Sequence, residues 1–250
     1  MDNQLQIYLD SNLASKYVDS TNHCEYILPL IDIDSQYHFI LSLVNASIPH
    51  SFYNVNSNNN RFQYVEDPYV TFIEHNYVIP IGNYTITQFV SQLQSMISPL
   101  QISYNSITNK MTFTHPTLPF CFYKSNNTCF ELLGLSNYDH FSPVNPKVIV
   151  SDVCCSMFSV RSICVCSNFH TDNVHVNKPH MQTIIGSIPV NSGPNSVITY
   201  QNLNSFKNNL FTNVVNAIAI KFVDQDGNKI DLNGCHYSMT LQLDIIKYVD

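Results

Sequence analysis

The last long apolar segment, residues 237–245, constrains the fold of this chain most strongly. Apolar residues occupy every second position from Tyr237 to Ile245, and Ser, Thr, Gln and Asp fill the positions between them. Side chains of a strand point alternately to the two faces of a sheet. The segment therefore predicts a strand with one face on a core and the other in solvent, which is typical of an antiparallel sheet.

The same period of two recurs along the chain and predicts a mainly β protein. It is clearest in residues 4–10, 37–44 and 218–222, where apolar side chains fall on one face. Most prolines lie at the ends of such runs or between them, where they do not interrupt a sheet. Shorter strands are predicted at residues 24–30, 69–73, 101–104, 110–114, 120–123, 147–150, 159–166, 182–189, 196–200 and 229–232.

One segment has a clear helical period. Thr85 and Gln88 have the spacing of a capping box, apolar residues recur every three or four positions after them, and Pro99 ends the pattern. A second, short helix is predicted over residues 128–133, because Gly134 can adopt the left-handed conformation that often follows a helix.

The order of these elements predicts a sandwich interrupted by an insertion. An Asn-rich link at residues 54–60 and a compact α/β segment separate the first strands from the later ones. We predict a jelly-roll β-sandwich from residues 1–53 and 140–250, with two main strands before the insertion and about six after it. Residues 54–139 would form an inserted α/β subdomain. Two small β-domains that meet near residue 140 are the alternative.

Charge is scarce in this sequence: 12% of residues are charged, and the net charge is −7. No Lys/Arg cluster is present, so we expect no nucleic-acid partner, because binding to phosphates needs one. An uncharged polar surface repels neighbouring molecules weakly and tolerates close self-association. The first residues lack the features of a secretory signal, and no apolar stretch is long enough to span a membrane.

The eight cysteines are predicted to be free thiols buried in strands. Most lie in apolar runs, where a free Cys behaves as a small apolar residue. A disulfide framework and a metal site are the alternatives. Cys164 and Cys166 would share one face of a strand, whereas the adjacent Cys154 and Cys155 would point to opposite faces. The others are Cys24, Cys121, Cys129 and Cys235.

Ionisable residues gather in three places, and none matches a strong site motif. One loop carries several; we interpret it as a solvated loop or a partner contact rather than a zinc site, because the spacing fits no zinc motif. Two acidic pairs are interpreted as turn residues, although the second weakly resembles a calcium loop. The loop residues are His170, Asp172, His175 and His180; the acidic pairs are Glu66 with Asp67, and Asp224 with Asp226, followed by Gly227 and Asp231.

The sequence contains no nucleophile elbow, no P-loop and no dinucleotide-binding glycine motif. We therefore expect a non-enzymatic protein with no catalytic, cofactor-binding or metal-binding residues and no cofactor. The sequons at Asn45, Asn83 and Asn126 are expected to stay unmodified.

Six segments, in this order, carry a resemblance to a known family: IYLDS (7–11), FILSLVNASIP (39–49), FYNVN (52–56), IPIGNYTITQF (79–89), FELLGL (130–135) and DGNKIDLNG (226–234). Together they resemble penton and minor capsid proteins of eukaryotic double-stranded DNA viruses, the lineage of virophages, polinton-like viruses and nucleocytoplasmic large DNA viruses. The Trp usual near the last segment is absent, and His236 and Tyr237 stand near its place.

The resemblance implies a jelly roll that stands upright in a viral shell, an insertion that projects outward, and homopentamers at a vertex. It implies a structural role in the virion capsid, with the major and other minor capsid proteins as partners. Assembly would take place in the host cytoplasm or viral factory. We also expect an N-terminal arm, residues 1–10, to pair with a sheet edge of a neighbouring molecule.

Two other functions are kept as alternatives. The chain could be a minor capsid or cement protein beneath or between the major capsomers. It could also be a carbohydrate-binding or adhesin-like sandwich that uses Tyr-rich loops, for instance around Tyr64 and Tyr69, as sugar platforms.

Overall fold

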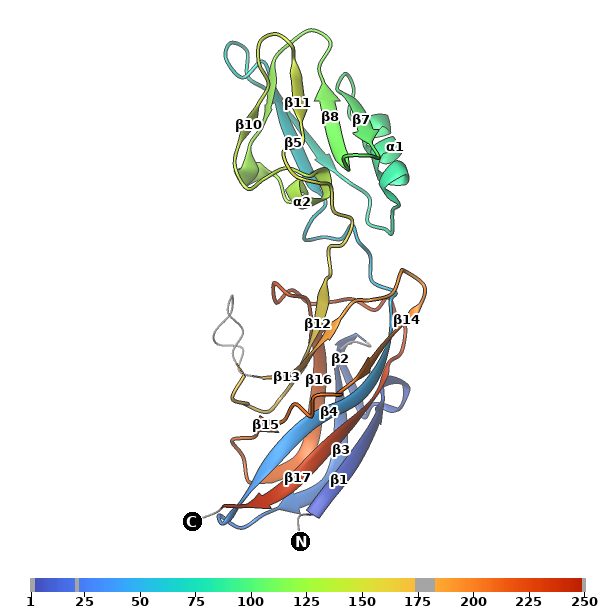
Figure 1. The fold of residues 1–250 in the computed structure, drawn as a ribbon, viewed down its shortest axis with the longest axis vertical. Coiled ribbons are helices and arrows are strands. Elements are labelled where there is room, and N and C mark those ends of the chain that lie inside the picture. Colours follow the sequence, from blue (N-terminus) through green and yellow to red (C-terminus); the bar gives the residue numbers. More distant parts are fainter. Residues whose placement is uncertain (1–2, 21–22, 174–182, 249–250) are drawn as a thin grey trace. The chain divides into compact units, whose positions relative to one another are not determined.

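The computed structural model describes residues 3–20, 23–173 and 183–248, which form two compact units (Figure 1). The sandwich unit comprises Met1–Phe52 and Val160–Asp250, and the inserted unit comprises Tyr53–Ser159. The chain thus leaves the sandwich unit once, builds the inserted unit from one continuous segment, and returns.

The described residues of the sandwich unit form two five-stranded antiparallel sheets. Their strands are β1 (Asn3–Asp10), β2 (Lys16–Ser20), β3 (His23–Asp32), β4 (Tyr37–Pro49), β12 (Ser162–Ser167), β13 (Ile184–Pro189), β14 (Val197–Gln201), β15 (Asn208–Asn209), β16 (Val214–Val223) and β17 (Ser238–Lys247). The first sheet has the order β1–β17–β4–β14, with β15 also paired to β4, and the second has the order β13–β12–β16–β3–β2. The prediction of a mainly β, jelly-roll fold is confirmed, but four strands precede the insertion rather than two.

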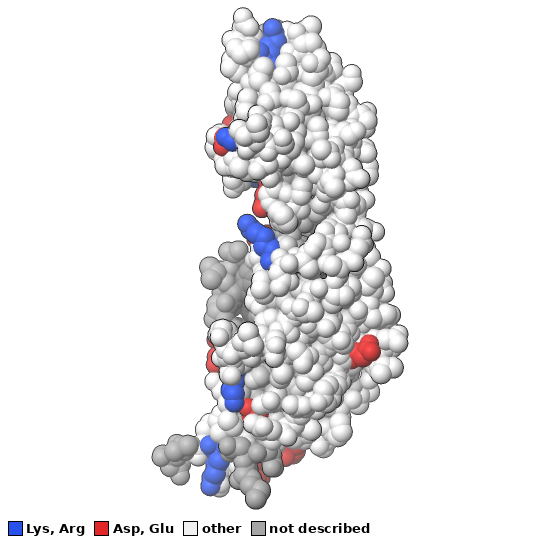
Figure 2. Space-filling model, turned by 45° about the vertical axis from the view of Figure 1, so that its right-hand side comes forward, with Lys and Arg blue, Asp and Glu red and all other residues white. Residues whose placement is uncertain are grey.

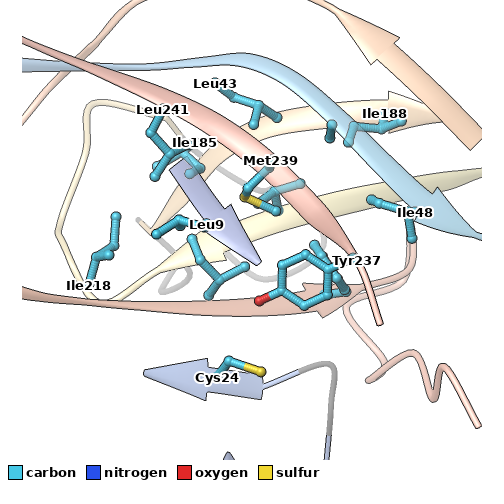
Figure 3. Packing of buried hydrophobic residues seen from close by; sticks show 14 of the residues in the cluster. Leu9, Cys24, Leu43, Ile48, Ile185, Ile188, Ile218, Tyr237, Met239 and Leu241 are labelled. Atoms are coloured by element: carbon cyan, nitrogen blue, oxygen red, sulfur yellow. The ribbon is translucent and has the colours of Figure 1, made fainter. Parts of the chain in front are cut away.

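The core of the sandwich lies between the two sheets, as the alternation predicts (Figure 3). Leu241 and Leu243 of β17 and Ile220 of β16 are at most 1% exposed. Burying a side chain of this size contributes about 1.5–3 kcal/mol. The sheets approach closely at Gly186 of β13, where an added Cβ would lie 2.9 Å from Leu43 Cδ2.

The outer face of β17 is less exposed to solvent than its polar residues predict. Thr240 and Asp244 are both buried. Lys207, just before β15, places its Nζ 2.8 Å from Asp244 Oδ2, and Gln242 Nε2 lies 2.7 Å from the other carboxylate oxygen. The ion pair replaces the water that the prediction assigned to this face.

The first strand pairs within its own chain. β1 runs antiparallel to β17 over its full length, from Asn3 opposite Ile245 to Asp10 opposite Ser238. The predicted arm is thus the edge strand of its own sheet, and no described strand lies on its other side. Its pairing with a sheet edge of a neighbouring molecule stays a prediction.

The inserted unit has two smaller antiparallel sheets and two helices (Figure 1). One sheet has the order β10 (His140–Phe141), β9 (Phe120–Phe122), β5 (Arg61–Glu66), β6 (Ile73–Val78), and the other has the order β11 (Val148–Val150), β8 (Lys110–Thr114), β7 (Gln101–Asn105). The helices are α1 (Ile86–Met96) and α2 (Phe130–Leu133); η1 (Ser11–Leu13) and η2 (Lys124–Asn126) are single 3₁₀ turns, the first of them in the sandwich unit. The inserted unit has its own buried core, centred on Phe62, Phe113, Phe120 and Phe122.

The helix predictions are confirmed. Thr85 caps α1, and the reciprocal contacts of a capping box with Gln88 are present. Phe89 and Leu93 form the buried face of α1. Gly134 ends α2 at φ +70, and an added Cβ there would lie 2.5 Å from Val153 O.

The sequence misplaces the first strands of the inserted unit. Of the strand predicted at residues 69–73, residues 69–72 lie in the connection between β5 and β6, and only Ile73 belongs to β6. β5 itself is not predicted. This connection turns sharply, since Asp67 and Phe72 have φ of 48 and 50. The short strand predicted at residues 229–232 is reduced to an isolated bridge between Val223 and Lys229.

The return to the sandwich unit lies at Val160, whereas the sequence places the boundary at residue 140. The intervening strands belong to the insertion, because β10 pairs with β9 and β11 pairs with β8. Ser151 strengthens this attachment: its Oγ donates to Leu133 O at 2.6 Å and accepts from Met111 N at 3.1 Å.

Candidate interaction surfaces

The histidine loop predicted from the sequence shows no site geometry where it is described. The carbonyl oxygen of His170 accepts a hydrogen bond from Phe211 N, and Asp172 Oδ2 accepts one from Asn209 Nδ2. His175 and His180 lie outside the described residues. Within residues 3–20, 23–173 and 183–248, no group of three or more His, Cys, Asp or Glu side chains could hold a metal ion.

The acidic pairs act within turns. Asp224 Oδ1 accepts hydrogen bonds from the backbone N–H groups of Asp226 (2.9 Å) and Asn228 (2.8 Å), and Oδ2 accepts one from Asn228 Nδ2. Asp67 Oδ2 accepts from both Thr71 N and Thr71 Oγ1. These carboxylates hold turns closed, which agrees with their interpretation as turn residues.

Glu66 belongs to a partly buried cluster that the sequence does not reveal. His75 Nε2 lies 3.0 Å from Glu66 Oε2, and His115 Nε2 lies 3.3 Å from Glu66 Oε1. His115 Nδ1 accepts hydrogen bonds from Thr117 N (3.3 Å) and Leu118 N (2.9 Å). Nδ1 therefore carries no proton, and the neutral ring holds its proton on Nε2, facing the carboxylate. Burial lowers the pKa of His115, and the nearby Glu66 opposes this shift.

A Ser–His contact in the sandwich unit is structural. Ser11 Oγ lies 3.1 Å from His236 Nδ1, but Ser11 is fully buried. Its Oγ also accepts the backbone N–H of Tyr237 at 2.9 Å. The hydroxyl thus fixes the start of β17 and has no access for a substrate.

All eight cysteines are free thiols. Cys164 and Cys166 share the outer face of β12, as predicted, and are buried there beside Val223. Burial raises the pKa of Cys166 to about 11 and that of Cys129 to about 12, so these thiols stay protonated at neutral pH. The prediction that the cysteines are buried is wrong for Cys154 and Cys235, which are exposed.

Two of the three sequon asparagines make structural contacts. Asn83 Oδ1 accepts the backbone N–H of Asn54, and Asn126 Nδ2 donates to Gln63 Oε1. Asn45 is exposed on β4.

The two predicted sugar platforms differ in exposure. Tyr64 is fully buried and stacks on His75 with ring centroids 4.5 Å apart, so it cannot face a ligand. Tyr69 is 61% exposed. Phe72 of the same β5–β6 connection is also exposed, and its ring contacts Tyr123.

The sandwich unit has a cleft of about 690 Å³ at one side of the two sheets. We call this the edge cleft. Its lining includes the buried residues Leu43, Cys164 and Ile185, of which we call Leu43 and Ile185 the floor, and is otherwise mostly uncharged side chains of β13 and of the segment from β14 to β15. A volume of this size is typical of a ligand site.

Charged side chains are few and scattered on the face drawn in Figure 2. Exposed apolar side chains lie among uncharged polar ones in both units, for example Ile27 and Phe211 in the sandwich unit and Val70 in the inserted unit. Surfaces of this kind gain from contact with other protein surfaces, because little charge has to be dehydrated. No helix in the described part of the chain is long and apolar enough to cross a membrane.

Comparison with known proteins finds likeness only at the level of structure. No family model and no curated protein matches the sequence. The crystal structure of the mavirus penton protein aligns over 98% of this chain and all of its own, with a TM-score of 0.55 and 12% identity. The chain has the fold of a penton protein. A chain in the cryo-EM structure of the Sputnik virophage also aligns, over 97% of this chain and 98% of its own, with a TM-score of 0.47 and 14% identity.

The penton fold accounts for both units together, because the alignment leaves almost no residue of either chain unmatched. An inserted unit between β4 and β12 is therefore part of the shared architecture. At 12% identity the likeness concerns the path of the chain and not individual side chains.

Proposed function

We propose that this chain is a structural capsid protein of a double-stranded DNA virus, and specifically the penton protein that forms homopentamers at the vertices. The observation that carries the proposal is the full-length likeness to the mavirus penton protein, including the insertion. The protein would reside in the virion, after assembly in the host cytoplasm or viral factory.

The physical properties of the chain support a role in assembly. Two closely packed sheets form a stiff block, and sparse surface charge lets copies pack without strong repulsion. The partners in this proposal are other copies of the chain, the major capsid protein and other minor capsid proteins. Nucleic acid is not among them, because the sequence has no cluster of basic residues.

The proposal assigns no catalytic reaction to the chain. Among the ionisable groups that come together, Glu66 lies beside His75 and His115, and the His115 ring is buried and bound to the backbone of its own turn. A catalytic acid or base needs access to a substrate.

The solution mass of the recombinant protein tests the pentamer. The chain has a mass of 28.5 kDa, and native mass spectrometry should show a species of five chains. A strict monomer at high concentration, together with a position away from the vertices in cryo-EM maps of intact particles, would contradict the penton assignment. A position beneath or between the major capsomers would instead favour the minor capsid or cement alternative.

The carbohydrate-binding alternative has weaker support, because one of its two predicted platforms, Tyr64, is buried. Strong, saturable binding on a glycan array, combined with absence from virions, would replace the capsid proposal with this one.

A further inference from the structure

The edge cleft lies where both sheets of the sandwich end. β13 is the last strand of one sheet, and β14 and β15 lie at the margin of the other. In the part of the chain that the structure describes, no strand follows β13 or β14. Residues from both margins line the same cleft, so it lies on the open side of the sandwich. An unpaired strand edge is a template for pairing with another chain.

The described lining of the cleft has buried apolar residues and no unpaired charge. Leu43 and Ile185 form buried parts of its lining, and Leu203 and Phe206 add apolar side chains that are 80% and 66% exposed. Among the described residues of the lining, Lys207 is the one that carries a charge, and its ammonium group pairs with the buried Asp244 at 2.8 Å. A charged ligand would lose its hydration here and gain no partner, so the lining matches an uncharged ligand.

Backbone carbonyl groups at the edge of β13 already accept hydrogen bonds from side-chain amides beside the cleft. Asn208 Nδ2 donates to Ile185 O at 3.0 Å, and Asn173 Nδ2 donates to Ile184 O at 2.8 Å. Asn208 Nδ2 also donates to Leu41 O of β4 at 2.9 Å. Side-chain amides thus replace a neighbouring strand along the first part of β13.

The next residues of β13 present the same chemistry to the cleft. Val190 N donates to Arg161 O, so these two residues form a hydrogen-bonded pair between β13 and β12. This pair determines which of the neighbouring pairs are hydrogen-bonded. Bonded and non-bonded pairs alternate along antiparallel strands, so the N–H and C=O of Ser187 point away from β12. Pro189 has no N–H and limits this edge to a short stretch.

We propose that the edge cleft binds a short, extended, uncharged peptide segment of another protein, which pairs with β13 at Ser187 and inserts apolar side chains over Leu43 and Ile185. The side-chain amides of Asn173 and Asn208 donate to the carbonyl groups of the preceding β13 residues. The backbone N–H of a bound peptide would donate to the carbonyl of Ser187 in the same way. Its alternate side chains reach the floor and the solvent in turn. The inference goes beyond the proposed function and does not depend on the pentamer.

A random heptapeptide library displayed on phage, selected on the immobilised full chain, tests the cleft. Enriched peptides should be uncharged, with apolar residues at alternate positions. Two variants should weaken their binding: Phe206→Ser removes an apolar side chain of the lining, and Ser187→Pro removes the N–H of the edge. Each should lower the affinity about tenfold or more, as expected when an anchor of a small interface is lost.

Matched variants separate the cleft from general stickiness. Phe211→Ser removes an equally exposed ring (71%) of the same unit that does not line the cleft, and Ser187→Ala keeps the N–H. Both should bind the selected peptides within about twofold of the unchanged protein. Unchanged melting temperatures would show that all four variants are folded.

Three results would overturn the inference: no enrichment above background, enriched peptides that are charged, or equal loss of binding in Phe206→Ser and Phe211→Ser. Binding of neutral oligosaccharides in place of peptides, lost in Phe206→Ser, would replace the peptide with a sugar. The mass of the chain in solution is measured separately, so failure of this test leaves the pentamer proposal standing.

Discussion

The two units bury their cores with different side chains. The sandwich unit uses mostly aliphatic residues from long strands, such as Leu241 of β17 and Ile220 of β16. The inserted unit uses a cluster of rings around Phe122, with Phe113, Phe120 and Phe62 at centroid distances of 5.0, 5.4 and 5.5 Å. Short strands bring few side chains into a core, so each must cover more area, and aromatic side chains do this.

The units also differ in how they hold their connections. The sandwich relies on long backbone pairing, such as the full-length pairing of β1 with β17. The inserted unit depends on single polar side chains: Asn127 binds the backbone N–H and C=O of Gln63, Ser151 binds Leu133 O, and His115 binds the N–H groups of its turn. Its stability is therefore concentrated in few residues, and single substitutions should cost more there.

The largest expected effect is the loss of a central ring. Phe122→Ala should destabilise the inserted unit by about 4 kcal/mol, whereas Leu241→Ala should destabilise the sandwich by about 3 kcal/mol. Hydrogen exchange of each unit in increasing urea measures the two values separately. Ile107→Ala, at a position 90% exposed in the inserted unit, is the control and should change stability by less than about 0.5 kcal/mol. Equal losses of stability in Leu241→Ala and Phe122→Ala would contradict the expected difference between the two cores.

The second effect concerns the end of α2. Gly134→Ala should cost about 3 kcal/mol, because the new Cβ meets Val153 O and because φ is +70. Gly234 in the sandwich has φ +78, but a Cβ added there would meet no atom within 4 Å. Gly234→Ala therefore measures the cost of the left-handed backbone alone, about 1–2 kcal/mol. Thermal unfolding of both variants gives the difference, and equal losses would show that the contact with Val153 carries no energy.

A smaller effect is expected where the sandwich sheets meet most closely. Gly186→Ala should cost about 1–2 kcal/mol, since its Cβ would lie 2.9 Å from the end of the Leu43 side chain. The double variant Gly186→Ala with Leu43→Val should recover part of this loss, because Val lacks the clashing methyl group. Gly193→Ala, which meets no atom within 4 Å, should be neutral in the same unfolding experiment. A double variant less stable than the sum of both single variants would contradict the packing argument.

The smallest effect is a pH dependence confined to the inserted unit. Burial lowers the pKa of His115 below 6.5, so the unfolded chain takes up the proton at a higher pH than the folded unit. Stability should be constant well above pH 6.5 and fall as the pH drops below that value, by at most about 1.4 kcal/mol per pH unit, until the folded-state pKa is reached. Protonation of Nδ1 would also break its bonds from Thr117 N and Leu118 N.

Melting of each unit at several pH values between about 8 and 5 measures this slope. His115→Asn should be less stable at neutral pH but should show a smaller pH slope. His170→Gln, which changes an exposed histidine of the sandwich unit, is the control and should leave the slope of the inserted unit unchanged. An unchanged slope in His115→Asn would assign the pH dependence to other groups.

Local patterns in the sequence predict the parts of the fold that local physics decides. The alternation of residues 237–245 gives β17 and its buried face, and Thr85, Gln88 and Gly134 give the helix ends. β5 escapes prediction because Gln63 and Val65 are buried as well as Phe62 and Tyr64, so its sequence does not alternate. The second boundary of the insertion escapes because β11 is identified only by its pairing with β8.

The candidate sites depend still more on distant residues. Glu66, His75 and His115 come from three different segments, and only the packed sheets bring them together. The edge cleft likewise exists only because β13 and β14 end on the same side of the sandwich. Composition therefore predicts the uncharged surface but not the edge cleft.

The pairing of β1 with β17 has a consequence for synthesis on the ribosome. The inserted unit is a continuous segment, Tyr53–Ser159, and can fold as soon as it has emerged. The first strand, by contrast, waits for a partner that ends at Lys247. The inserted unit can thus form before β1 has its partner, and the edge of β4 that receives β17 stays open until β17 has been synthesised.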